Sequence, residues 1–98
     1  MEKNVMEELT ITIWEDNALR MNEMEPNLKM ALKRVGLKAR IQLNSEVPLL
    51  SRQKLLGRTP AVQVNDGDMW FHTTGVAITS EQFEALLYKL RSIGLLEF

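Results

Sequence analysis

The chain has 98 residues, a net charge of −1, a hydrophobic content of 45% and no cysteine. This length suits one domain with one core. The absence of thiols excludes disulfides, dithiol redox chemistry and cysteine-ligated metals. The near-neutral charge provides no global basic field for nucleic acid or an anionic membrane, and no run reaches the roughly 18 apolar residues of a membrane span. We therefore expect a soluble cytoplasmic protein without nucleic-acid or membrane partners.

The first half of the chain predicts a strand, a long helix and a second strand. Residues 1–8 are polar, and we expect a lead-in that is partly disordered. Residues 9–14 alternate apolar and β-branched polar side chains, which is typical of a strand, and residues 38–43 alternate again. Between them a helical stripe ends at Gly36, a typical C-terminal cap. The stripe consists of Met21, Met24, Leu28, Ala31, Leu32 and Val35.

The second half predicts a short helix or irregular turn, a hairpin and a final helix. The short element spans residues 46–56, and a strand over 59–64 begins at a proline. The Asn-Asp-Gly turn at 65–67 predicts an antiparallel return strand over 69–72. Thr79 and Gln82 have the spacing of a capping box and start the last helix. The order β-α-β-(α)-β-β-α predicts an α/β domain with a central mixed four-stranded sheet and helices on both faces.

This order, with a Thr-Pro opening the third strand, resembles the thioredoxin-like fold. The segment Thr59-Pro60-Ala61-Val62-Gln63-Val64-Asn65-Asp66-Gly67 is similar to one found in very small thioredoxin-like proteins called redox-active disulfide proteins. The resemblance covers nearly the whole chain in order and spacing, so residues 9–98 are expected to form a single thioredoxin-like domain. It also implies a cis bond between Thr59 and Pro60, although cis is the minority state of X-Pro bonds.

The redox motif of that family is missing here. Its Cys-x-x-Cys lies between the first strand and the first helix, and the matching window is Ala18-Leu19-Arg20-Met21. Pro26 supports this alignment, because many thioredoxins carry a proline five positions after the second cysteine. Methionine sulfur does not ionise, so the nucleophile for disulfide exchange is lost. The resemblance therefore implies the fold without the family's activity.

The first functional hypothesis is a non-catalytic module that binds a protein partner. Its site would be Ala18, Met21, Thr59 and Pro60, because the resemblance brings these positions to one end of the sheet. Met21 would give an adaptable apolar patch there, and Thr59 would offer backbone hydrogen bonds to an extended segment. The competing interpretation is that the end is vestigial and Met21 fills the core.

Two further functions stay open. A structural subunit could form a homodimer or a larger assembly through residues 95–98 or 47–50, which are apolar. A thiol-independent enzyme ranks last, because His72 is the only histidine and no serine lies in a glycine-flanked elbow. A half-exposed strand residue is the simpler interpretation of His72. We expect no catalytic residues, no metal site and no cofactor.

Overall fold

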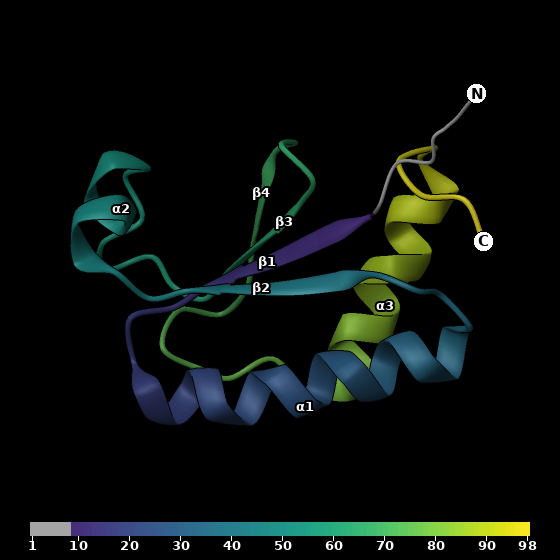
Figure 1. Cartoon of the computed structure of the whole chain (residues 1–98), viewed down its shortest axis with the longest axis horizontal. Helices are drawn as coiled ribbons and strands as arrows, with labels where there is room; N and C mark the ends of the chain where they lie inside the picture. Colours follow the sequence, from purple (N-terminus) through teal and green to yellow (C-terminus); the bar gives the residue numbers. More distant parts are fainter. Residues whose placement is uncertain (1–8) are drawn as a thin grey trace.

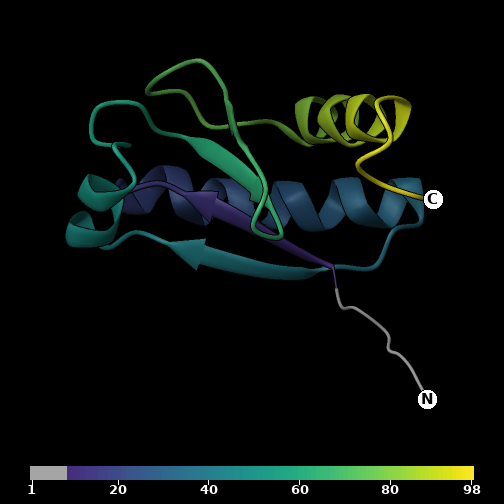
Figure 2. The same ribbon diagram turned by 90° about the horizontal axis from the view of Figure 1, so that it is seen from above.

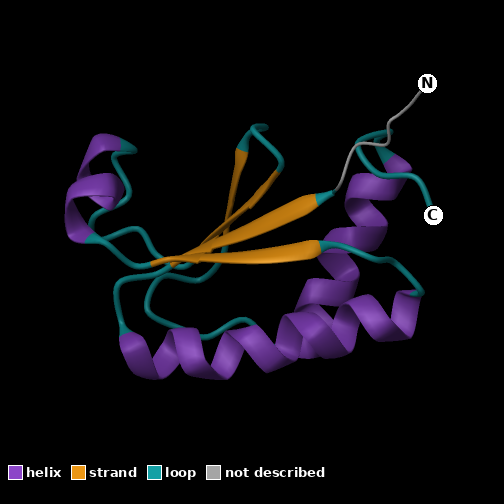
Figure 3. Ribbon diagram, viewed as in Figure 1, coloured by secondary structure: helices purple, strands orange, loops and turns teal. Residues whose placement is uncertain are grey.

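The computed structural model describes residues 9–98 and has the predicted order of elements (Figures 1 and 3). The expectation for residues 1–8 lies outside the described residues. The strand and helix boundaries differ from the sequence-based ones by a few residues. The elements are β1 (Thr10–Trp14), α1 (Ala18–Val35), β2 (Arg40–Asn44), α2 (Val47–Arg52), β3 (Ala61–Val64), β4 (Met69–Phe71) and α3 (Ser80–Ser92).

The four strands form one mixed sheet in the order β2-β1-β3-β4. β1 and β2 are parallel and joined by α1, as the sequence predicts, while β3 runs antiparallel to both β1 and β4. In the register of the sheet, Ile13 is paired with Leu43 of β2 and with Val62 of β3. The mixed four-stranded α/β architecture is thus confirmed.

The main core lies between the sheet and two helices. α1 and α3 lie on the same face (Figure 1), and Figure 2 shows the strands in front of α1. The whole predicted stripe of α1 faces this core, where Val35 is partly buried and the other members are buried. Burial of such side chains contributes about 1.5–3 kcal/mol each, so this interface dominates the stability of the fold. The largest side chains buried in it are Phe83, Ile11, Ile13, Met24, Leu28 and Leu90.

Local signals fix the helix ends. The Asn17 side chain caps α1 by accepting a hydrogen bond from the Arg20 amide. Gly36 follows α1 with a φ of 75°, a left-handed conformation that glycine adopts without a Cβ penalty. Thr79 and Gln82 form the predicted capping box of α3, with both reciprocal hydrogen bonds present. These caps satisfy amide and carbonyl groups that helices leave unpaired at their ends.

A second, smaller core occupies one end of the opposite sheet face. Leu50 of α2 and Leu55 pack there against Trp14 and Ala61. In Figure 1, α2 accordingly stands beside one end of the sheet. Helices therefore contact both faces, but on this face α2 covers one end of the sheet.

Part of the segment after α3 packs against the rest of the domain. Leu96 is buried in the main core, while Leu95 is exposed, so Leu96 and not Leu95 contacts the core after α3. The Phe98 ring lies against Tyr88, with 5.7 Å between ring centroids. Across residues 9–98, every helix is too short or too polar to cross a membrane.

Candidate functional site at the Thr59 end of the sheet

The four residues of the predicted site differ in their exposure to solvent. Ala18 is exposed at the first position of α1, whereas Thr59 and Pro60 are buried. Met21 is 6% exposed and belongs to the main core. The structure thus agrees with the core-filling interpretation of Met21, and Met21 does not form a surface patch. The bond between Thr59 and Pro60 is cis, as the resemblance implied.

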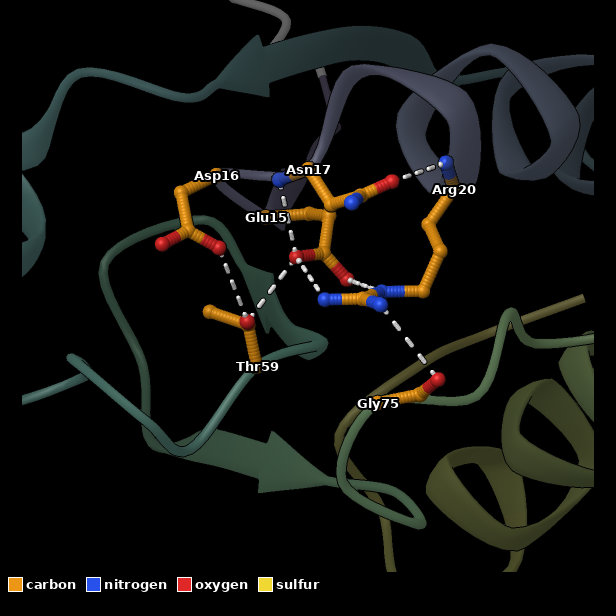
Figure 4. Close-up of polar contacts among 6 residues, drawn as sticks. All are labelled: Glu15, Asp16, Asn17, Arg20, Thr59 and Gly75. Carbon is orange, nitrogen blue, oxygen red and sulfur yellow. Dashed lines mark hydrogen bonds and ion pairs between the residues drawn. The ribbon is translucent and has the colours of Figure 1, made fainter.

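A buried carboxylate occupies the loop between β1 and α1 (Figure 4). The Glu15 side chain is 0% exposed, and its Oε1 accepts a hydrogen bond from Arg20 Nε at 2.8 Å. Its Oε2 accepts from Arg20 Nη2 at 3.2 Å and from the Thr59 hydroxyl at 2.9 Å. The Asn17 amide also donates to Oε2, at 3.1 Å. The carboxylate therefore ties β1 and α1 to the segment before β3, although residues 15 and 59 are distant in sequence.

Gly75 completes this arrangement from the loop after β4. Its amide donates to the Thr59 carbonyl at 2.9 Å, and its own carbonyl accepts from Arg20 Nη1 at 3.4 Å. Arg20 thus bridges the start of α1 and the Gly75 loop, as Figure 4 shows. We call Glu15, Arg20, Thr59 and Gly75, with their hydrogen bonds, the Thr59 end.

The hydrogen bonds set the charge state of Glu15. Burial alone would raise the pKa of this carboxyl group, because water no longer solvates its charge. Hydrogen bonds from Arg20, the Asn17 amide and the Thr59 hydroxyl, with the positive charge of Arg20, instead bring the pKa of Glu15 below its ordinary value of 4.5. The same contact raises the pKa of Arg20. At neutral pH Glu15 is therefore deprotonated and Arg20 protonated, and both oxygens of the carboxylate accept hydrogen bonds.

Two apolar side chains lie exposed beside this network. Leu19 is 80% exposed and precedes Arg20, and Val76 is 49% exposed and follows Gly75. Because Arg20 and Gly75 are hydrogen-bonded, both side chains belong to the same end of the molecule. The Thr59 amide has no hydrogen-bond acceptor within residues 9–98, whereas its carbonyl is used by Gly75. The backbone of Thr59 was expected to form hydrogen bonds with an extended segment. Within residues 9–98, only its amide is left without a partner for this.

Two titratable side chains lie near this end of the sheet, Glu15 and His72. Glu15 is held by its partners, and His72 is half-exposed just after β4 with its amide donating to the Pro60 carbonyl at 3.4 Å. Among residues 9–98, no three histidine, aspartate or glutamate side chains gather where they could hold a metal ion.

Sequence reasoning located this end of the sheet but missed the residues that build it. In the sequence Glu15 looks like an ordinary loop residue, Arg20 stands in the degenerate redox window, and nothing marks Gly75 as a residue that joins them. The available signal was an acid directly after a buried strand, followed five residues later by arginine. Comparison with models of protein families, with curated proteins and with solved structures found nothing that matches this chain.

Proposed function

We propose that this chain is a redox-inactive, non-catalytic thioredoxin-like domain that binds an extended segment of a partner protein at the Thr59 end. A cytoplasmic location is part of the same proposal. The observation that carries it is the Thr59 amide, which belongs to a buried residue and lacks an acceptor within the described chain. Buried amides are almost always paired, and an extended segment supplies carbonyl acceptors at regular intervals.

The surroundings of this amide favour a segment with apolar side chains. Leu19 and Val76 would contact such side chains on either side of the Arg20–Gly75 hydrogen bond. The ion pair between Glu15 and Arg20 holds the start of α1 and the Gly75 loop in fixed positions. A preorganised surface loses less entropy on binding, so a small contact can be specific.

Affinity capture from an extract of the source cell tests this proposal. We expect Leu19→Asp combined with Val76→Asp to abolish capture of the partner, because the two charges replace apolar contacts without touching the core. The control is Ile93→Asp, which should retain the partner. Ile93 is 52% exposed, close to the 49% of Val76, and caps the end of α3, which lies far from the start of α1 (Figure 1). Equal capture by all three proteins, or loss only with Ile93→Asp, would contradict the proposal.

A homo-oligomeric structural subunit is the second candidate. It is favoured by the exposure of Ile93 and Leu95 near the C-terminus and of Val47 in α2. In this case sedimentation should show a mass that rises with protein concentration, and Ile93→Asp should remove the rise. A constant monomer mass over the accessible concentrations would rule out self-association.

A further inference from the structure

The sheet face opposite α1 and α3 carries a polar groove of about 670 Å³. This volume falls within the roughly 300–1,000 Å³ of typical small-molecule sites. Thr10, Thr12 and Trp14 of β1 line its middle, because they alternate with the core residues Ile11 and Ile13. α2 and Leu55 cover the Trp14 end of this face. Thr12 at the floor is 5% exposed, whereas Gln42, Gln53 and Asn65 of the groove are exposed to solvent.

Amide side chains dominate the lining. Among the described residues that form the groove there is no lysine, arginine or histidine, and Asp66 is the only acid. The described lining therefore includes no cation, and Arg40, which is paired with Thr10 at the end of β2, lies outside it. A primary amide donates and accepts hydrogen bonds at once, and a hydroxyl group does the same. The amides come from β2, from β3 and the turn that follows it, and from the C-cap of α2: Gln42, Asn44, Gln63, Asn65 and Gln53.

Part of this lining is held in place within the chain. Gln63 accepts a hydrogen bond from the Trp14 indole at 3.2 Å and donates to the Gly67 carbonyl at 2.9 Å. Asn65 Oδ1 accepts from the Thr10 amide at 2.9 Å, and Gln42 Oε1 accepts from the Thr12 hydroxyl at 3.4 Å. Within residues 9–98, the Nε2 of Gln42 and the Nδ2 of Asn65 have no hydrogen-bond partner, although the orientation of both side chains is already set.

Two more amides complete the set of available groups. The side chains of Asn44 and Gln53 have no hydrogen-bond partner within residues 9–98. Amide groups on β2 and at the end of α2 could therefore form hydrogen bonds with a ligand in the groove. The floor beneath them includes the Trp14 indole. From this neutral, amide-rich lining we infer that the groove binds a small uncharged polyhydroxylated molecule of the carbohydrate class. This inference does not depend on the function proposed for the Thr59 end.

Nuclear magnetic resonance titration of the full ¹⁵N-labelled chain tests the inference. The probes are maltotriose, cellotriose and myo-inositol, with inorganic phosphate as the anionic comparison. We expect at least one neutral probe to shift the side-chain amide signals of Gln42, Asn44 and Gln53 and the Trp14 indole signal in a saturable way. Phosphate should leave these signals unchanged.

Variants separate the groove from the rest of the surface. Gln42→Ala combined with Gln53→Ala should weaken binding of that probe about tenfold or more, because two hydrogen bonds are lost. Asn22→Ala removes an exposed amide from α1, on the other face, and should leave the affinity unchanged. Absence of saturable shifts with all three neutral probes, binding that ignores the groove variants, or a groove response to phosphate alone would each overturn the inference.

Discussion

Replacing Arg20 with methionine is expected to lower the free energy of unfolding at neutral pH, and by clearly more than the same change at the exposed Arg34. Methionine keeps most of the apolar stem but leaves the Glu15 carboxylate, which is 0% exposed, without its cation. The Arg20 side chain is 29% exposed, so water reaches part of the site and limits the loss. Denaturant unfolding of both proteins measures the difference.

The loss should depend on pH in a defined direction. In the wild type the pKa of Glu15 is lowered, so its stabilising contribution is present above the ordinary value of 4.5 and disappears as the pH falls through the lowered pKa. Without Arg20, Glu15 loses the strongest of the interactions that lower its pKa, so the variant can relieve its unpaired charge by taking up a proton at a higher pH than the wild type does. The difference in unfolding free energy should therefore be largest at neutral pH and shrink in acid.

Arg34→Met is the matched control for this prediction. Arg34 pairs with Glu84 at 2.9 Å and with Glu81 at 3.4 Å, but its side chain is exposed. Exposed pairs contribute about 0–1 kcal/mol, so this variant should lose little. A similar loss for the two variants would show that the Glu15 site has no special role in stability.

Leu55→Ala is expected to cost about 3 kcal/mol of unfolding free energy, because it leaves a cavity in the second core. Leu55 is 0% exposed and packs in the cluster that includes Trp14 and Ala61, whereas its neighbour Leu56 is 47% exposed. Leu56→Ala makes the same chemical change in the same loop and should cost no more than about 0.5 kcal/mol. Thermal or denaturant unfolding of both variants measures the contrast. Equal losses would mean that the α2 end of the sheet is not packed as described.

Much of the fold follows from short-range patterns. Strand alternation at residues 9–14, the stripe of α1 and the Thr79–Gln82 box each report on neighbours within a few residues, and such signals survive in a single sequence. The same alternation put Thr12 and Trp14 on the face opposite Ile11 and Ile13. Where α2 ends, and that Leu96 and not Leu95 is buried, depends on tertiary packing that the local pattern does not encode.

The two sites were harder to predict because they depend on distant pairings. Glu15 meets Thr59 only after β1 and β3 align, and the approach of Arg20 to Gly75 requires the loop after β4. The polar groove likewise requires the register that sets Thr12 between Gln42 and Gln63. Met21 shows the opposite case, because the helical stripe indicated the core and the resemblance indicated the site, and the structure buries Met21 in the core.

The most direct test of the proposed function is site-specific photo-crosslinking. Leu19 would be replaced by p-benzoyl-phenylalanine in the full chain, with the same replacement at Ile93 as the control. Crosslinked partners from the source cell would then be mapped by mass spectrometry. The proposal predicts crosslinks from position 19, absent from position 93, that converge on one short segment of a partner protein and are lost with Val76→Asp. Crosslinks only from position 93, or only to a second copy of this chain, would contradict binding at the Thr59 end.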